Sequence, residues 1–274
     1  MRIDTGAGKN ASSRLVTTLA GLALLASACS GKGNGSPFDG SPFVGIALTP
    51  SATGVVDDVA SGVRGAWYAY GDSVGPNASD AGTDFPGSDC AKAGFTSDQC
   101  SVIAAPIPGQ PFAPDSVKGM CTKGTAAQVL DSNVGPNYSA IYGAGIALDF
   151  NNPGSDAGAA KGYLDMTPYV GIGFDFTAEV IPSKAMRVNF PFNGETAGHT
   201  PFWGGTAMTY SPLTSGAHVE IRWADVAPPT YLEPGILPLD KRQVASIQFQ
   251  VYSSSTATTP FSYCVNNLTL LTAL

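Results

Sequence analysis

Seven polar side chains that could bind a ligand or take part in acid–base chemistry lie within short apolar segments: Asp149, Asp175, Arg187, Asn189, Arg222, Gln248 and Gln250. Their carboxylate, amide and guanidinium groups are planar and can form paired hydrogen bonds with neighbouring hydroxyls. Asp149 and Asp175 could also act as a pair, because glycoside hydrolysis needs two carboxylates about 5 to 9 Å apart and neighbouring strands would hold them near the shorter spacing. The sequence therefore offers a binding set and one candidate catalytic pair.

Signatures of nucleotide-dependent enzymes are absent from the sequence. It has no phosphate-binding G-x-x-x-x-G-K-[ST] loop and no dinucleotide fingerprint. It also has no C-x-x-C spacing, and neither His199 nor His218 has a cysteine nearby, which argues against zinc. Nothing distinguishes Asp149 and Asp175 from binding groups. We therefore expect a protein that is not an enzyme.

The segments that carry these side chains alternate apolar and polar residues with a period of two, which is typical of half-buried β-strands. In GIALDF, for example, Ile146, Leu148 and Phe150 fall on one side and Asp149 on the other. The segments with this pattern are Gly145–Phe150, Gly171–Phe176, Met186–Phe190, Val219–Trp223 and Ile247–Tyr252, with further strands expected at Val63–Tyr70 and Cys264–Leu271. They predict an all-β fold, an antiparallel β-sandwich with apolar sides packed together and polar sides outward.

Composition agrees with such a fold and excludes one class of partner. The chain has 33 Gly and 21 Pro, only 13% charged residues and a net charge of −7. Many turn residues and few charges favour short strands over long helices. An acidic chain without a basic stripe is not expected to bind nucleic acid. We expect one β-sandwich domain over residues 43–274, with a Gly- and Asp-rich insertion at about 71–118.

The amino-terminal residues indicate export. Arg2, Lys9 and Arg14 precede the uncharged run Leu15–Leu25, which has the length of a signal peptide core and is too short to span a bilayer. Small residues then lead to Cys29, as in the lipobox of bacterial lipoproteins, although an ordinary A-x-A cleavage site is an alternative. We expect a signal peptide at 1–28, lipid attachment at Cys29, a flexible tether at 29–42, and a location at the outer membrane or cell surface.

Four cysteines remain once Cys29 is assigned to lipid, an even number in a compartment that permits disulfides. Four cysteines allow three pairings. We expect Cys90–Cys100, which closes a short loop within the insertion, and Cys121–Cys264, which ties an early strand to the last one.

The order of the segments YGAGIALDFN, YVGIGFDF, MRVNFPF, VEIRWADV, IQFQVY and CVNNLTL resembles the galactose-binding-like β-jelly rolls, among them carbohydrate-binding modules of secreted bacterial proteins. The likeness covers roughly Val55 to Leu271. It implies a non-catalytic module that binds glycan on one sheet or at a loop-lined edge. Many such modules hold a structural calcium, for which Asp57 and Asp58 are the candidates here, although Asn266 and Asn267 stand where acidic residues are common.

A glycan offers hydroxyls to planar polar groups and a C–H face to aromatic rings. The seven polar residues, expected together on the polar face of one sheet, would supply the first contact, and Tyr142, Phe202 and Trp203 the second, while Trp67 and Trp223 are expected in the core. The expected function is therefore that of a surface-anchored, carbohydrate-binding lipoprotein. Two alternatives stay open: a structural or adhesive envelope lipoprotein that contacts protein through a merely solvated sheet face, and a glycoside hydrolase that uses Asp149 and Asp175.

Overall fold

The computed structural model describes residues 43–72, 94–105, 107–108, 119–132, 135–136, 138, 141–152, 162–180, 186–194, 200–204, 215–227 and 238–273. The expected signal peptide, the tether, Cys29 and Cys90 lie outside these residues. Within them, no helix is long and apolar enough to cross a membrane.

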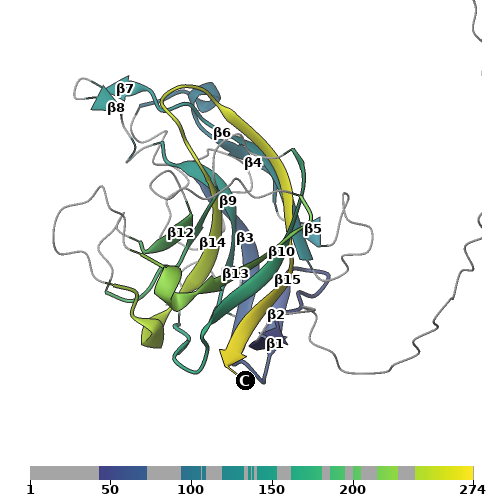
Figure 1. Cartoon of the computed structure of the whole chain (residues 1–274). Helices are drawn as coiled ribbons and strands as arrows, with labels where there is room; N and C mark the ends of the chain where they lie inside the picture. Colours follow the sequence, from purple (N-terminus) through teal and green to yellow (C-terminus); the bar gives the residue numbers. More distant parts are fainter. Residues whose placement is uncertain are drawn as a thin grey trace, which may run out of the picture.

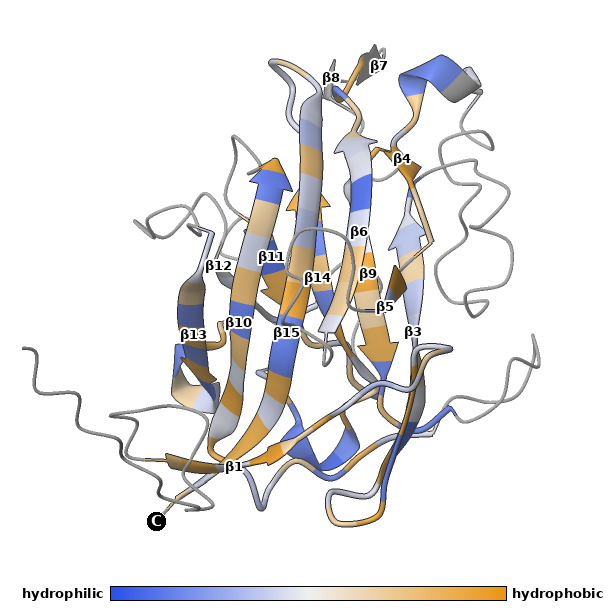
Figure 2. Cartoon of the chain, turned by 90° about the vertical axis from the view of Figure 1, so that its right-hand side faces the viewer, coloured by the Kyte–Doolittle hydropathy of each residue, from blue (hydrophilic) through white to orange (hydrophobic). Residues whose placement is uncertain are grey.

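Most described strands belong to two antiparallel sheets that pack face to face (Figures 1 and 2). Sheet I has the order β13-β10-β15-β6-β4, with β1 also paired to β15 and β5 to β6. Sheet II has the order β12-β11-β14-β9-β3-β2. The predicted all-β antiparallel sandwich is confirmed. The long strands β3, β6, β9, β10, β11, β13, β14 and β15 alternate between the two sheets along the chain, as in a jelly roll.

Seven strands correspond to the predicted segments, and their ends differ from the prediction by up to five residues. Sheet I contains β1 (Phe43–Ala47), β4 (Val102–Ile103), β5 (Ile107–Pro108), β6 (Gly119–Ala126), β10 (Gly171–Val180), β13 (Ala217–Arg222) and β15 (Thr259–Ala273). Sheet II contains β2 (Val55–Asp58), β3 (Val63–Gly71), β9 (Gly143–Asp149), β11 (Met186–Asn189), β12 (Phe202–Gly204) and β14 (Ser246–Tyr252). The remaining elements are the β7 (Asp131–Ser132) and β8 (Gly135–Pro136) pair and three short 3₁₀ turns, η1 (Ser97–Gln99), η2 (Trp223–Asp225) and η3 (Lys241–Gln243).

The core lies between the sheets and is built from the apolar side of each strand. Phe174 of β10 meets Phe249 of β14 edge to face, with ring centroids 5.0 Å apart, and Trp67 of β3 stacks on Phe249 at 5.9 Å. Trp223 is half-buried against the core and contacts Phe190 at 5.4 Å. Both tryptophans therefore pack in the core, as predicted. The strands form because β-branched and aromatic residues bury well on one side of a pleated sheet.

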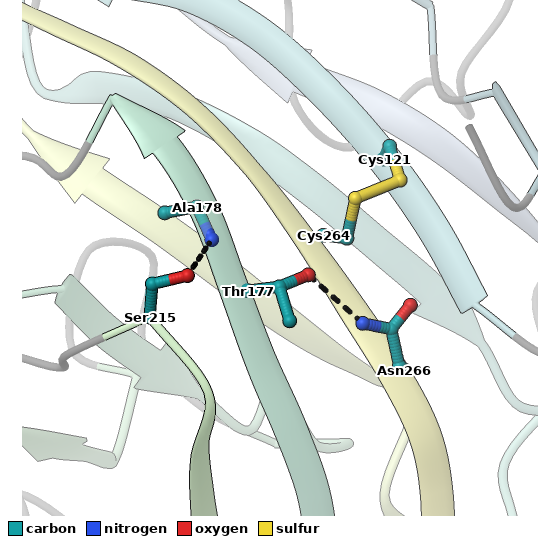
Figure 3. Close-up of a disulfide and its surroundings, with 6 residues drawn as sticks. All are labelled: Cys121, Thr177, Ala178, Ser215, Cys264 and Asn266. Carbon is teal, nitrogen blue, oxygen red and sulfur yellow. Dashed lines mark hydrogen bonds between the residues drawn. A yellow bond between two sulfur atoms is a disulfide. The ribbon is translucent and has the colours of Figure 1, made fainter. Parts of the chain in front are cut away.

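The disulfide Cys121–Cys264 joins register partners on β6 and β15, on the outer side of sheet I (Figure 3). This predicted pairing is confirmed. Beside it, the Asn266 amide donates to Thr177 Oγ1 of β10 at 3.0 Å. Cys100 is also disulfide-bonded, but its partner lies outside the described residues, so the Cys90–Cys100 bridge stays a prediction.

A buried carboxylate connects the two sheets at one end. Asp72, directly after β3, is fully buried and accepts hydrogen bonds of 2.8 Å from the backbone N–H of Ser101 and of Gly143. Ser101 precedes β4 of sheet I and Gly143 begins β9 of sheet II. Burial raises the pKa of Asp72 above its ordinary value, and these hydrogen bonds oppose the rise.

Candidate functional site

The outer side of sheet II carries most of the predicted binding residues. Because side chains alternate along a strand, the inward positions of Trp67, Ile146, Leu148 and Phe249 set their neighbours outward. We call the resulting surface the polar face; its members are Tyr68 and Tyr70 of β3, Gly143, Gly145, Ala147 and Asp149 of β9, Ser246, Gln248, Gln250 and Tyr252 of β14, and Arg187 and Asn189 of β11.

Strand register arranges the polar face as two rows that cross the sheet. One row runs Tyr68, Ala147, Gln248, Asn189, and the next runs Tyr70, Gly145, Gln250, Arg187. Each row has a phenol on β3, a residue with little or no side chain on β9, and amide or guanidinium groups beyond it. The small residues of β9 allow the tyrosines to reach toward the amides, since no side chain larger than a methyl group stands between them.

Hydrogen bonds link the amides to one another and to the strand ends. The Asn189 amide donates to Gln250 Oε1 at 3.0 Å, and Gln250 Nε2 donates to the carbonyl of Tyr142 at 3.1 Å. Asn152 donates to Asp149 at 3.2 Å. Gln248 is buried, and its Nε2 lies near the Tyr68 oxygen but makes no well-formed hydrogen bond among the described residues. This amide therefore has donor capacity that an incoming acceptor could use.

Tyr68 and Tyr70 of the polar face stay neutral and able to donate. Burial raises the pKa of Tyr68 well above its usual range, the charge of Asp149 raises it further, and contacts with Ser246 and Gln248 oppose the rise to a lesser extent. Burial is also the main cause of the raised pKa of Tyr70, against which a contact with Asn189 acts. Beside these groups, the Arg187 guanidinium lies 4.8 Å from the ring centroid of Tyr252, within the range of a cation–π contact.

Exposure differs between the middle and the margins of this surface. Tyr70, Gln248 and Gln250 are buried, whereas Tyr68 and Arg187 are only half-buried. Tyr142, which lies next to the first residue of β9, is half-buried as well. A molecule that approaches the polar face would therefore meet the margin groups first.

Two of the predicted binding residues belong to the other sheet. Asp175 is on β10 and Arg222 on β13, both strands of sheet I, and they face outward there because Ile172, Phe174 and Ile221 face the core. Asp175 forms a hydrogen bond of 2.8 Å with His218 Nδ1 and accepts one of 2.6 Å from the Asn267 amide. Both partners lie on strands of sheet I.

The expectation that all seven polar residues share one face is therefore wrong. Arg222 instead lies over the ring of Phe43, with its guanidinium carbon 5.2 Å from the centroid. Asp149 and Asp175 are not on neighbouring strands, since β9 and β10 belong to different sheets and both carboxylates point away from the shared core. This placement contradicts the glycoside hydrolase alternative, which required the two carboxylates on neighbouring strands. Alternation predicts which side of a strand is polar, but not which sheet the strand joins.

The aromatic candidates have mixed outcomes. Trp203 pairs with Val188 and is half-buried, with its side chain packed against the core. Phe202 pairs with Asn189 through the backbone, and the structure describes only its backbone. Sequence reasoning missed Tyr68, Tyr70 and Tyr252. The signal was present: with Trp67 inward, the alternation of VRGAWYAY sets both tyrosines outward, and IQFQVY sets Tyr252 beside the glutamines.

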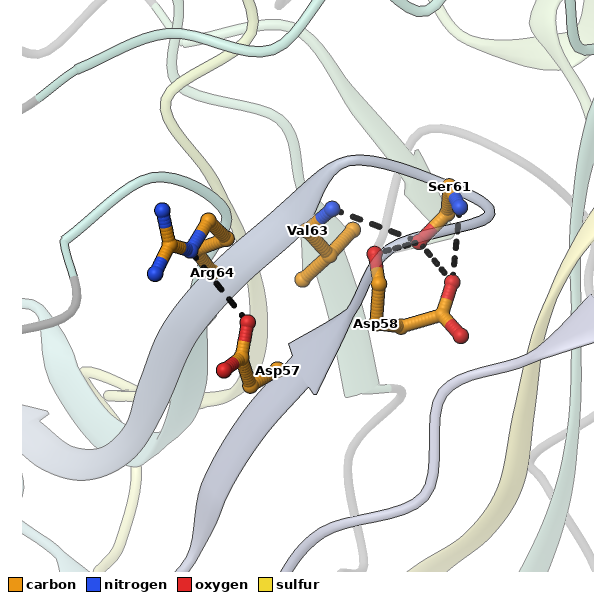
Figure 4. Close-up of polar contacts among 5 residues, drawn as sticks. All are labelled: Asp57, Asp58, Ser61, Val63 and Arg64. Carbon is orange, nitrogen blue, oxygen red and sulfur yellow. Dashed lines mark hydrogen bonds and ion pairs between the residues drawn. The ribbon is translucent and has the colours of Figure 1, made fainter.

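The candidate calcium ligands Asp57 and Asp58 are both bonded to groups of their own hairpin (Figure 4). Asp57 pairs with Arg64 Nε at 3.2 Å, and Asp58 Oδ2 accepts from the Ser61 N–H at 2.7 Å and from its hydroxyl at 2.6 Å. Asn266 and Asn267 bond to β10 instead. Among the described residues, no group of three or more His, Cys, Asp or Glu is placed to hold a metal ion. In this structure the two aspartates stabilise the β2–β3 turn.

No protein-family model and no curated protein matches this chain. Among solved structures, the chain is similar to the family 11 carbohydrate-binding module of a cellulosomal cellulase of Clostridium thermocellum, with 15% identity, a TM-score of 0.39, and coverage of 64% of this chain and 84% of that one. A structure of the Clostridium thermocellum module in complex with a β-1,3-1,4-mixed-linked tetrasaccharide gives 17% identity, a TM-score of 0.39, and coverage of 64% and 85%. At this level the likeness carries no ligand over to this chain.

Proposed function

We propose that the protein binds carbohydrate without catalysis, through the polar face of sheet II. The observation that carries the proposal is the pair of rows in which a tyrosine, a small residue and an amide follow one another across three strands. Phenols and amides both donate and accept, as sugar hydroxyls do, and a tyrosine ring offers an apolar surface to the C–H groups of a sugar.

The Gln248 amide supports a ligand, because its N–H makes no well-formed hydrogen bond with the Tyr68 oxygen beside it. A buried amide N–H without an acceptor costs about 1 to 3 kcal/mol, and an oxygen of a bound ligand would remove that cost. The half-buried Tyr68 and Tyr142 are the aromatic groups that a sugar could reach from outside.

Catalysis is not part of the proposal because the polar face, as defined above, contains a single carboxylate. Hydrolysis by the usual route needs two carboxylates at close spacing, and Asp175 lies on the outer side of sheet I. Asp149 is instead held by the Asn152 amide beside Tyr68.

The binding experiment is calorimetric titration of the purified full chain with soluble glycans of different linkage, namely mixed-linked β-glucan, xylan, chitin oligosaccharide and α-glucan. We expect one class to bind, and we expect Gln248→Ala to weaken binding about fivefold to tenfold, as for the loss of one neutral hydrogen bond. Arg222→Ala on sheet I is the matched control and should bind as the unmodified chain does. No heat with any glycan, together with recovery of a protein partner by cross-linking, would support the adhesive alternative instead.

We also propose that the polar face is displayed outside the cytoplasm on a lipid anchor at Cys29. The disulfide Cys121–Cys264 supports an oxidising compartment. Residues 29–42 would span at most about 50 Å when extended, enough to hold the sandwich clear of a membrane. Many copies on one surface could then engage a polysaccharide together, so a weak single site would suffice. Mass spectrometry of the mature amino terminus tests the anchor, and an unmodified Cys29 would refute it.

A further inference from the structure

A tyrosine from sheet I connects directly to the backbone of sheet II. Tyr263 of β15 is fully buried, and its ring stacks on Phe176 with centroids 5.7 Å apart. Its hydroxyl crosses the interior, donates to the carbonyl of Phe249 on β14 at 2.7 Å and accepts from the N–H of Ile146 on β9 at 3.3 Å. One hydroxyl therefore contacts both strands that form the middle of the polar face.

The contact lies directly beneath one of the two rows. Ile146 and Phe249 are register partners, and the next partners along the strands are Gly145 and Gln250, which face outward. Strand β9 approaches β14 closely here, because a Cβ atom built on Gly145 would lie 1.9 Å from the Phe249 carbonyl oxygen. That carbonyl is thus held between Gly145 on one side and the Tyr263 hydroxyl on the other.

We propose that Tyr263 is a positioning residue for the polar face: its hydroxyl holds β9 against β14 and so sets how far Tyr70 lies from Gln250 across Gly145. This inference rests on the proposed carbohydrate binding, since it concerns the same surface. A binding site loses affinity when its groups shift by a fraction of an ångström, so the hydroxyl acts on a ligand that it never touches.

The surroundings of Tyr263 agree with this role. Burial raises the pKa of Tyr263 far above its usual range, which keeps its hydroxyl neutral and able to donate. The rings of Phe176 and Phe261 limit its movement.

The test compares Tyr263→Phe with Tyr169→Phe in the full chain. Phe keeps the ring of Tyr263 and removes only the hydroxyl. Tyr169 is the matched control, since it is also a buried tyrosine and its hydroxyl bonds a backbone carbonyl, that of Ser61, in the turn after β2. We expect Tyr263→Phe to weaken glycan binding about tenfold, because displacement of Tyr70 and Gln250 would cost the ligand about one hydrogen bond. Tyr169→Phe should leave affinity unchanged. Equal affinities for both variants would overturn the inference.

A second measurement keeps this inference separate from the proposed function. In the NMR spectrum of the unliganded chain, Tyr263→Phe should shift the side-chain amide signals of Gln248 and Gln250, and Tyr169→Phe should not. If no glycan binds, the proposed function fails, and the spectra alone decide whether Tyr263 positions the face. Unmoved amide signals in Tyr263→Phe would overturn that role.

Discussion

The amide of Asn189 on β11 donates to Gln250 Oε1 on β14, and the two residues belong to adjacent rows of the polar face. The bond is 3.0 Å long and buried. It therefore couples the rows, so that a change at either residue affects the other.

We expect Gln250→Ala and Asn189→Ala each to lower the free energy of unfolding by about 1 to 3 kcal/mol, because each leaves a buried polar partner unsatisfied. The double variant should cost less than the sum, with a coupling of about 1 kcal/mol. Urea denaturation of the four proteins measures this. Strictly additive losses would contradict the coupling.

Tyr68 allows ring packing to be separated from hydrogen bonding. We expect Tyr68→Ala to weaken glycan binding more than about tenfold, and Tyr68→Phe to weaken it less, because Phe retains the ring face that packs on sugar C–H groups. Titration calorimetry provides the affinities. Asp175→Ala, on the outer side of sheet I, is the control and should bind normally. Loss of binding in Asp175→Ala would indicate that the glycan binds to sheet I and would contradict a site on sheet II.

Asp72 makes stability depend on pH with a defined sign. Its pKa in the folded protein is raised above its ordinary value of 3.8, chiefly by burial. The folded state therefore binds this proton before the unfolded state does, so the contribution of Asp72 to stability rises as the pH falls through its folded pKa and levels off below 3.8. Carbonyl NMR of Asp72 measures the pKa. A measured pKa of Asp72 at or below 3.8 would contradict this expectation.

Asp72→Asn should nevertheless destabilise the protein by about 1 to 3 kcal/mol at neutral pH, because an amide can accept through only one of its two terminal atoms. Either the N–H of Ser101 or that of Gly143 would then face another donor. Asp57→Asn, at an exposed ion pair of the β2–β3 hairpin, is a suitable control and should change stability by less than about 1 kcal/mol. Chemical denaturation of both variants provides the comparison.

Replacing both Cys121 and Cys264 by Ala should lower the free energy of unfolding by up to about 5 kcal/mol, the chain-entropy value for a loop of this length. The sequence separation is 143 residues. The free energy of unfolding should also fall more steeply with denaturant concentration, since an unfolded chain without the bridge exposes more surface. The variant is preferable to chemical reduction, which would also break the bridge at Cys100. Unchanged stability would indicate that the unfolded chain is compact without the bridge.

Several parts of the fold could be predicted from local pattern. Alternation identified the buried side of β9, β10, β11, β13 and β14, and Ile146, Leu148 and Phe150 are all in the core. The pairing of Cys121 with Cys264 was one of three pairings that four cysteines allow, and the structure confirms it.

The division of polar residues between two sheets could not be predicted in the same way. GIALDF and GIGFDF have nearly the same pattern, yet Asp149 joins sheet II and Asp175 joins sheet I. Pairing between distant strands decides this, and a local period contains no information about it. The outward direction of Tyr68 and Tyr70, in contrast, could have been predicted, since it follows from the inward position of Trp67 alone.

Strand β15 has a consequence for how the molecule can be made. It lies between β6 and β10 in sheet I and also pairs with β1, yet it is the last of the described strands to leave the ribosome. Until residues 259–273 are available, β6 and β10 have no common partner, and β1 must wait for a strand more than two hundred residues further along. Such non-local pairing makes folding slow. Sheet I is therefore completed only after residues 259–273 have been synthesised.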